Sequence, residues 1–140
     1  MKESYNPKKV GERTEGQVLA LMLMLDKVVL TPFGDNQRYD FVIEENGEFA
    51  RIQCKTGRLR NGVVEFEACS SSSHRTGGGK RSYKGEADFF AVYCPDNKKT
   101  YWVPVDDVPR SHGKLRIVPP KNNQSKGVKW AKGYELNVPD

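Results

Sequence analysis

The sequence of 140 residues has few of the side chains that cross-link or metallate small proteins. Its three cysteines, Cys54, Cys69 and Cys94, form no CxxC pair, and the two histidines, His74 and His112, do not supply metal-ligand spacing. An odd number of widely spaced cysteines beside apolar runs argues against a disulfide framework and against a zinc site. We therefore expect three free thiols in or near the core.

Long apolar runs are also missing. The longest covers residues 18–25, well short of the roughly 20 residues that cross a bilayer. Residues 1–11 are polar and basic, without the apolar segment of a secretion signal. These features predict a protein with no membrane partner, located inside the cell in the cytoplasm or nucleoid.

Acidic residues are absent from one long stretch. Residues 108–134 contain seven basic side chains and no acidic one, and residues 51–84 contain eight basic side chains and two glutamates. The net charge is +5, so the rest of the chain is acidic. Such segregation is the electrostatic footprint of a polyanion binder. A charge run kept for solubility is the plainer alternative.

The pattern of apolar residues predicts one helix followed by short strands in a single domain. Val18, Leu19, Met22 and Leu25 form one stripe of a helix over residues 11–27. Asn-Gly pairs predict hairpins in an antiparallel meander of three strands. Residues 69–84 are polar and glycine-rich, which predicts a mobile loop. The predicted strands lie at residues 39–44, 48–55, 63–68, 87–94, 100–105, 115–118 and 135–138.

Polar side chains of chemical interest fall on neighbouring elements. Side chains alternate along a strand, so Gln53 and Lys55 share one face of the second meander strand. The hairpin sets Asp40 beside the end of that strand. Glu15 lies at the start of the predicted helix, on its buried stripe. We expect these four side chains to converge.

Such a set suits hydrolysis of phosphodiesters. A divalent cation offsets the negative charge that develops on the attacking and leaving oxygens, and Mg²⁺ needs one or two protein carboxylates. Asp40 would be the central ligand, and Gln53 would offer an amide oxygen. Glu15 would hold metal-bound water or a second ion. Lys55 would position the nucleophilic water or stabilise charge on the phosphoryl oxygens.

Gly11-x-x-x-Glu15, Asp40 and Gln53-Cys54-Lys55 resemble the PD-(D/E)XK nuclease superfamily, most closely its group I intron-encoded homing endonucleases. The resemblance spans residues 11–107 and rests on the stretches 34–43, 51–56 and 87–95. It implies an α/β, restriction-endonuclease-like αβββαβ core with a mixed central sheet and flanking helices. It also implies Mg²⁺-dependent cleavage of double-stranded DNA, with Mn²⁺ as the alternative ion, by a homodimer or homotetramer without a small-molecule cofactor. The chain then divides into a flexible start (1–10), the nuclease core (11–118) and a basic tail (119–140) that packs on the core or on a partner subunit.

Two residues depart from the family pattern. Tyr39 replaces the proline of the family name, and Gln53 stands where most members carry Asp or Glu. A neutral ligand weakens metal binding, so a catalytically inactive DNA-binding module stays open beside the site-specific endonuclease. A Holliday-junction resolvase or repair nuclease of the same fold is a further alternative. Other carboxylates could enter the site in another register: Glu12 in place of Glu15, and Glu65, Glu67, Glu86 or Asp88.

The remaining basic residues are candidate DNA contacts: Arg58, Arg60, Arg75, Lys80, Arg81 and Lys84. Phosphate contacts give affinity, whereas sequence choice requires contacts to base edges. Candidates for base contacts are Arg58, Arg60, Asn61 and the serine-rich loop. Trp130 and Tyr134 in the tail either stack on bases or, as we favour, pin the tail to the body or to another subunit.

Overall fold

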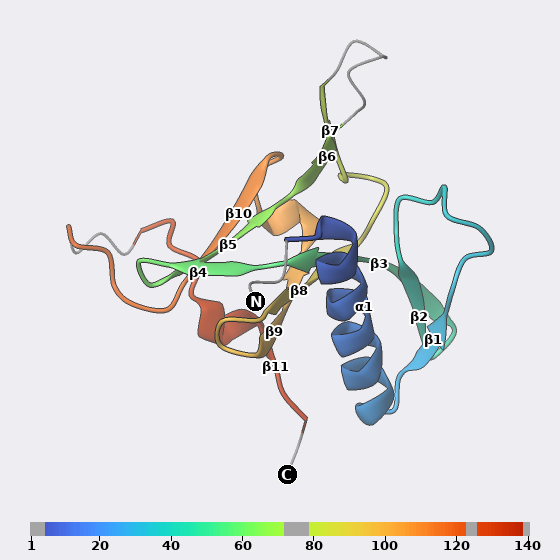
Figure 1. The fold of residues 1–140 in the computed structure, drawn as a ribbon. Helices are drawn as coiled ribbons and strands as arrows, with labels where there is room; N and C mark the ends of the chain where they lie inside the picture. The colour runs from blue at the N-terminus through green and yellow to red at the C-terminus, as the bar shows by residue number, and fades with distance from the viewer. Residues whose placement is uncertain (1–4, 72–78, 123–125, 139–140) are drawn as a thin grey trace.

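The computed structural model of the protein describes residues 5–71, 79–122 and 126–138 (Figure 1). A six-stranded sheet lies at its centre in the order β1-β2-β3-β8-β9-β11. Strands β3 and β8 run parallel, and each other neighbouring pair runs antiparallel. The mixed α/β class predicted from the sequence is confirmed. The bounds are β1 Val28–Leu30, β2 Phe41–Glu45, β3 Glu48–Thr56, β8 Phe89–Cys94, β9 Lys99–Pro104 and β11 Glu135–Leu136.

Helix α1 (Pro7–Met24) covers one face of this sheet. It begins four residues earlier than predicted, because Asn6 caps it and Pro7 occupies the first turn. The Asn6 side chain accepts hydrogen bonds from the backbone N–H groups of Lys8 (3.1 Å) and Lys9 (3.4 Å). Residues 7–10 therefore belong to the helix and not to a flexible start. Residues 1–4 lie outside the described part of the chain.

The second sheet corrects the predicted three-stranded meander. Strand β5 (Val63–Glu67) pairs with β4 (Arg58–Arg60) on one side and β10 (His112–Arg116) on the other, and not with β3. The change of sheet occurs at Gly57, between β3 and β4. A Cβ atom at this position would lie 2.9 Å from Val64 Cγ1 and 3.0 Å from Val92 Cγ1, so the second sheet packs too closely for a larger residue.

The predicted loop at residues 69–84 contains a two-stranded hairpin. Strand β6 (Cys69–Ser71) pairs antiparallel with β7 (Lys80–Ser82), and residues 72–78 between them lie outside the described residues. The implied αβββαβ order places a second helix between β3 and β8. In the described part of this crossover, the chain forms strands β4 to β7 instead.

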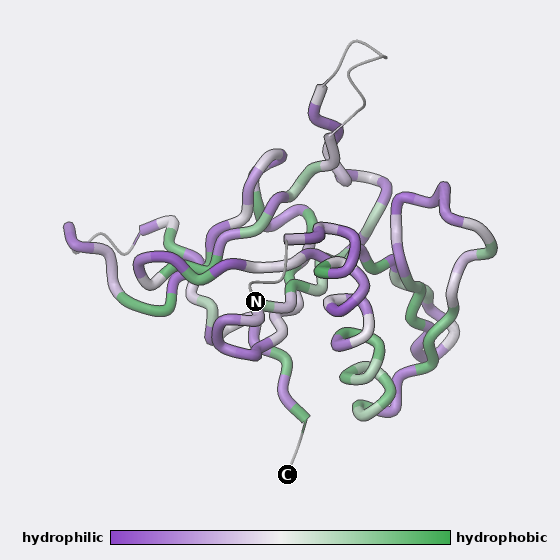
Figure 2. The backbone as a smooth tube through the Cα atoms, viewed as in Figure 1, coloured by the Kyte–Doolittle hydropathy of each residue, from purple (hydrophilic) through white to green (hydrophobic). Residues whose placement is uncertain are grey.

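The core has two parts, one on each face of the central sheet. Side chains of α1 pack on Phe41, Ile43, Ile52, Cys54 and Ala91. The opposite face packs against the second sheet through Val64, Phe66, Phe90, Val92, Tyr101 and Leu115. Figure 2 shows that the first half of α1 is hydrophilic and its second half apolar. The three cysteines are buried free thiols, as expected.

In the described part of the tail, residues 131–136 lie against the body. Strand β11 pairs with β9, and a 3-10 turn at Ala131–Tyr134 precedes it. Ala131 is buried, and the Tyr134 hydroxyl donates to Asp107 Oδ2 at 3.0 Å. A second 3-10 turn lies at Val105–Asp107. Among the described helices, none combines the length and apolar character that a bilayer crossing needs.

Candidate active site

Asp40 directly precedes β2. The pairing of β2 with β3 stops at Phe41 and Ile52, so the rest of β3 has an open edge on this side. The Asp40 N–H still donates to the carbonyl of Ile52 at 2.8 Å. Its carboxylate oxygen Oδ2 then accepts from the N–H of Cys54 at 2.9 Å. The carboxylate therefore takes the backbone donor that a longer β2 would have used, and it is held at the open edge of β3.

Glu15 reaches the same place from α1. Burial first, and then the hydrogen bond and the charge of Asp40, raise the pKa of Glu15 from 4.5 to about 7. The helix is held close to β3 by a hydrogen bond between the hydroxyls of Thr14 and Thr56, 2.6 Å apart. Glu12 is exposed and contributes the smallest of the effects on Glu15. The structure thus pairs Asp40 with Glu15 rather than with Glu12.

Gln53 and Lys55 occupy the face of β3 that points away from α1. Ile52 and Cys54 are buried against the helix, and the alternating residues are half-buried on the other side. The register pairs Phe41 with Ile52, which puts Asp40 beside Gln53. The Gln53 amide N–H donates to the carbonyl of Cys54 at 3.4 Å.

The ammonium of Lys55 is held by the β6–β7 hairpin. It donates to the carbonyl of Cys69 at 3.2 Å and to the hydroxyl of Tyr83 at 3.3 Å, and it lies 4.6 Å from the centre of the Tyr83 ring. Among the described residues, it makes no hydrogen bond or ion pair with Asp40 or Glu15. The structure therefore brings Glu15 to Asp40 and makes Gln53 the register neighbour of Asp40. In the described residues, neither Gln53 nor Lys55 makes a hydrogen bond or ion pair with the two carboxylates.

Tyr83 contacts both Lys55 and Arg38, and neither Tyr83 nor Arg38 was among the residues predicted for the site. The Tyr83 side chain is buried, and the Arg38 guanidinium lies 4.0 Å from its ring centre. Arg38 also donates to the carbonyls of Arg81 (3.2 Å) and Ser82 (2.9 Å), to Ser70 Oγ and to Glu86 Oε2 (3.1 Å). Arg38 thereby attaches the hairpin to the body. An aromatic residue that ends a polar loop was the signal that could have indicated Tyr83.

The oxygen donors at this edge fit a hard cation. Within the described residues, no three side chains of His, Cys, Asp or Glu gather as a metal cluster. The available set is two carboxylates and an amide, which suits a hydrated ion such as Mg²⁺ and not a tetrahedral zinc centre. Burial, and then the charges of Asp40 and Glu15, raise the pKa of the adjacent Cys54 thiol, so it stays protonated.

The alternative carboxylates are engaged elsewhere. Asp88 accepts three hydrogen bonds from Arg51, and these hydrogen bonds lower the pKa of Asp88. Glu86 forms ion pairs with Arg38 and Arg81. Glu65 and Glu67 lie on β5 in the second sheet. None of these groups is placed with Asp40 and Glu15.

The candidate DNA contacts differ in what surrounds them. The ammonium of Lys84 donates hydrogen bonds to the carbonyls of Val105 (3.4 Å) and Val108 (3.2 Å). Arg81 pairs with Glu86, and Arg58 donates to the hydroxyl of Tyr5 at 2.9 Å. Arg60 and Lys80 are exposed. Arg75 lies outside the described residues.

Comparison with known proteins shows the family of the chain. A family model described as PD-(D/E)XK endonuclease matches residues 5–137. The chain belongs to the PD-(D/E)XK endonuclease family. The match to the family confirms the predicted resemblance and extends it into the tail. No curated protein matches the sequence.

A solved structure, that of the bacterial homing endonuclease I-Ssp6803I, has the same fold as this PD-(D/E)XK endonuclease. The TM-score is 0.73 and the sequence identity is 23%, over 94% of this chain and 89% of that chain. The similarity in fold therefore extends over nearly the whole chain.

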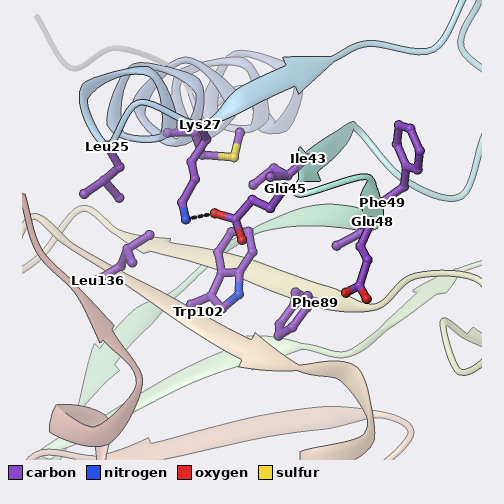
Figure 3. A pocket seen from close by; sticks show the side chains of 11 residues that line it. Leu25, Lys27, Ile43, Glu45, Glu48, Phe49, Phe89, Trp102 and Leu136 are labelled. Atoms are coloured by element: carbon purple, nitrogen blue, oxygen red, sulfur yellow. Dashed lines mark hydrogen bonds and ion pairs between the residues drawn. The ribbon is translucent and has the colours of Figure 1, made fainter.

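Among the hollows in the described part of this nuclease, two are lined by residues from opposite ends of strand β3. One of about 340 Å³ is lined by Lys55 and Thr56, by the second sheet and by residues of the segment 5–11, where α1 begins. The other, of about 400 Å³, is mostly apolar, with charged residues in part of its wall (Figure 3). Its walls include the stacked rings of Phe89 and Trp102, 5.0 Å apart, and an ion pair between Lys27 and Glu45. None of the four predicted site residues lines the apolar hollow.

Proposed function

We propose that the protein is a metal-dependent, site-specific endonuclease that hydrolyses phosphodiester bonds of double-stranded DNA. Its active site consists of Glu15, Asp40, Gln53 and Lys55. The observation that carries this proposal is the position of Asp40 at the open edge of β3, where the Cys54 N–H holds it and Gln53 is its register neighbour. Glu15 lies close enough for Asp40 to raise its pKa. Mg²⁺ is the expected ion and Mn²⁺ the alternative.

Each residue has a role that follows from its position. Asp40, oriented by the Cys54 N–H, and the amide oxygen of Gln53 would hold the cation. When bound, the cation offsets the charge that develops on the phosphoryl and leaving oxygens. Glu15 exchanges its proton near neutral pH and would hold water in its carboxylate form. Lys55, held by Cys69 and Tyr83, would stabilise charge on the phosphoryl oxygens.

Cleavage of supercoiled plasmid tests this function. The wild type should cut in Mg²⁺ and be inactive in EDTA. Lys55→Ala should abolish cutting while DNA binding is kept. Lys98→Ala removes an exposed lysine from the turn between β8 and β9 and should cut as the wild type does. Cutting in EDTA, or cutting by Lys55→Ala at the wild-type rate, would contradict the proposal.

The neutral side chain of Gln53 favours a second candidate, a DNA-binding module without catalysis. This module would bind linear, supercoiled and four-way DNA without cutting any of them. Discrete fragments from long duplex DNA support site-specific cleavage, whereas preferential cutting of a synthetic junction supports a resolvase. Gln53→Glu adds a negative charge to the ligand set, so it should lower the Mg²⁺ concentration needed for half-maximal cutting by roughly tenfold.

We also propose that the enzyme assembles as a homodimer or homotetramer, which allows two sites to address two strands. Large apolar side chains are exposed at the end of α1 and on the neighbouring strands. Leu23 is 55% exposed, Met24 66% and Phe49 64%. Burial of these side chains against a second copy would remove them from water.

A further inference from the structure

One face of the second sheet points away from the core. Leu59, Val64, Phe66 and Leu115 point inward and are buried or partly buried. The alternating positions therefore point outward. We call this outward surface the β10 face; it consists of Arg58 and Arg60 on β4, Glu65 and Glu67 on β5, and His112, Lys114 and Arg116 on β10, whereas Val63 at the start of β5 is buried.

The strand register arranges these side chains in three rows. Glu65 lies between Arg58 and Lys114, with one of them on each neighbouring strand. Val63 lies in the same way between Arg60 and Arg116, and Glu67 lies opposite His112. Directly opposed side chains are about 4.5–5.5 Å apart at Cβ. The rows therefore present closely spaced donors and acceptors.

Three cations of the β10 face have no side-chain partner in the described part of the chain, in contrast to other basic groups of the molecule. Arg38, Arg51, Arg81 and Lys84 are engaged by carboxylates or carbonyls of the body. No hydrogen bond or ion pair joins the side chains of Arg60, Lys114 or Arg116 to the described residues. On this face, Arg58 has a partner in the hydroxyl of Tyr5.

The β10 face continues into the proposed active site. The hollow of about 340 Å³ includes Lys55 and Thr56 in its lining, together with residues at the start of α1. Its other walls include Arg58 and Arg60 from β4, Glu65 and Glu67 from β5, and His112 from β10. A polyanion that lies on the face therefore reaches the strand that carries Gln53 and Lys55.

We propose that the β10 face enters the major groove of DNA and discriminates between base pairs. The inference rests on the proposed function for the identity of the ligand. Two carboxylates on a purely phosphate-binding face would be repelled by the backbone, whereas in the groove a carboxylate accepts from the amino group of cytosine. Arg58 and Lys114, on either side of Glu65, match the acceptors of guanine. The major groove admits a two-stranded antiparallel ribbon, and the antiparallel pair β5–β10 provides one.

Selection from a pool of duplexes with a randomised segment tests the inference, with binding measured in EDTA. Glu65→Gln should change the preferred base at one position of the selected sequence. Its affinity for an unselected duplex should stay within about twofold. Lys114→Ala should relax the preference at one base pair by about tenfold or more. The controls Glu48→Gln and Lys98→Ala remove exposed charges away from the face and should leave the selected sequence unchanged.

The outcomes separate this inference from the proposed function. If Glu65→Gln tightens binding to every duplex equally and the selected sequence is unchanged, the face acts through net charge alone and the inference is overturned. A wild type that selects no sequence overturns it as well. Both results leave Mg²⁺-dependent cutting to be judged separately. Conversely, a wild type that selects a sequence and never cuts DNA supports the face and contradicts the nuclease.

Discussion

The carboxyl of Glu15 changes charge near neutral pH, which makes the stability of the metal-free protein depend on pH. In the folded protein the pKa of Glu15 is about 7, and its ordinary value is 4.5. Between these values the folded state binds more protons than the unfolded chain, so stability falls as pH rises. The stabilisation is complete below 4.5 and is lost above about 7.

Glu15→Gln removes this titration. In EDTA, the urea midpoint of the variant relative to the wild type should rise from about pH 5 to about pH 8, and then level off. Glu12→Gln, an exposed position on the same helix, should show no such trend. Parallel midpoint curves for the two variants would show that Glu15 is not held against Asp40.

The Tyr83 hydroxyl contacts the ammonium of Lys55, which is proposed to act on the phosphate. Tyr83→Phe keeps the ring that packs on Phe90 and removes the 3.3 Å contact to Lys55. A hydrogen bond to a charged group is worth about 1.5–3 kcal/mol. We therefore expect the single-turnover cutting rate to fall roughly tenfold or more while the Kd for DNA is unchanged.

Tyr101→Phe is the matched control for this measurement. Tyr101 is also buried, and its hydroxyl accepts a hydrogen bond from Asn97 at 2.9 Å, away from the proposed site. This variant should cut at the wild-type rate. An equal loss of activity in both variants would indicate general destabilisation instead of a role in orienting Lys55.

At the scale of elements, local turns could be predicted from the sequence and the pairing of distant strands could not. Asn46-Gly47 and Asn61-Gly62 form hairpin turns with positive φ at all four residues, as their residue types indicate. Strand β5 pairs outside the central sheet because the chain changes sheet at Gly57. At this residue, Val64 of β5 and Val92 of β8 leave no room for a side chain. Such long-range packing leaves no local pattern.

In the candidate site, too, local contacts could be predicted from the sequence and long-range contacts could not. The β2–β3 hairpin sets Asp40 beside Gln53, and this arrangement follows from turn geometry and strand alternation. The partners of Lys55 lie 14 and 28 residues away, at Cys69 and Tyr83. Residues 69–84 have the composition of a loop, and their hairpin is held by Arg38 from outside the segment. The roles of the four site residues stay predictions.

Gly57 provides a prediction about the junction of the two sheets. Gly57→Ala brings a methyl group within about 3 Å of Val64 and Val92 and should destabilise the fold by about 1–3 kcal/mol. Urea unfolding measures this change. Gly16→Ala, on α1 with no atom within 4 Å of the added carbon, should be neutral or stabilising. Equal stability of the two variants would show that the sheets can move apart at this point.

For the whole molecule, the exposed apolar side chains predict self-association. Met24→Glu places a charge on the proposed contact surface and should lower the mass of the assembly measured by light scattering. Lys98→Glu changes charge in a turn outside this surface and should leave the mass unchanged. A wild type with the mass of a single chain at all concentrations would contradict the proposed homodimer or homotetramer.

The parallel pair β3 and β8 has a consequence for the order of folding. Each belongs to a local hairpin, β2–β3 or β8–β9, but their alignment requires closure of the intervening segment that contains β4 to β7. Closing long segments slows folding more than forming local turns does. We expect a growing chain that ends before Tyr83 to contain Glu15 and Asp40 without the tyrosine that seats Lys55. Competence to cut DNA would then be acquired late, after most of the chain has been synthesised.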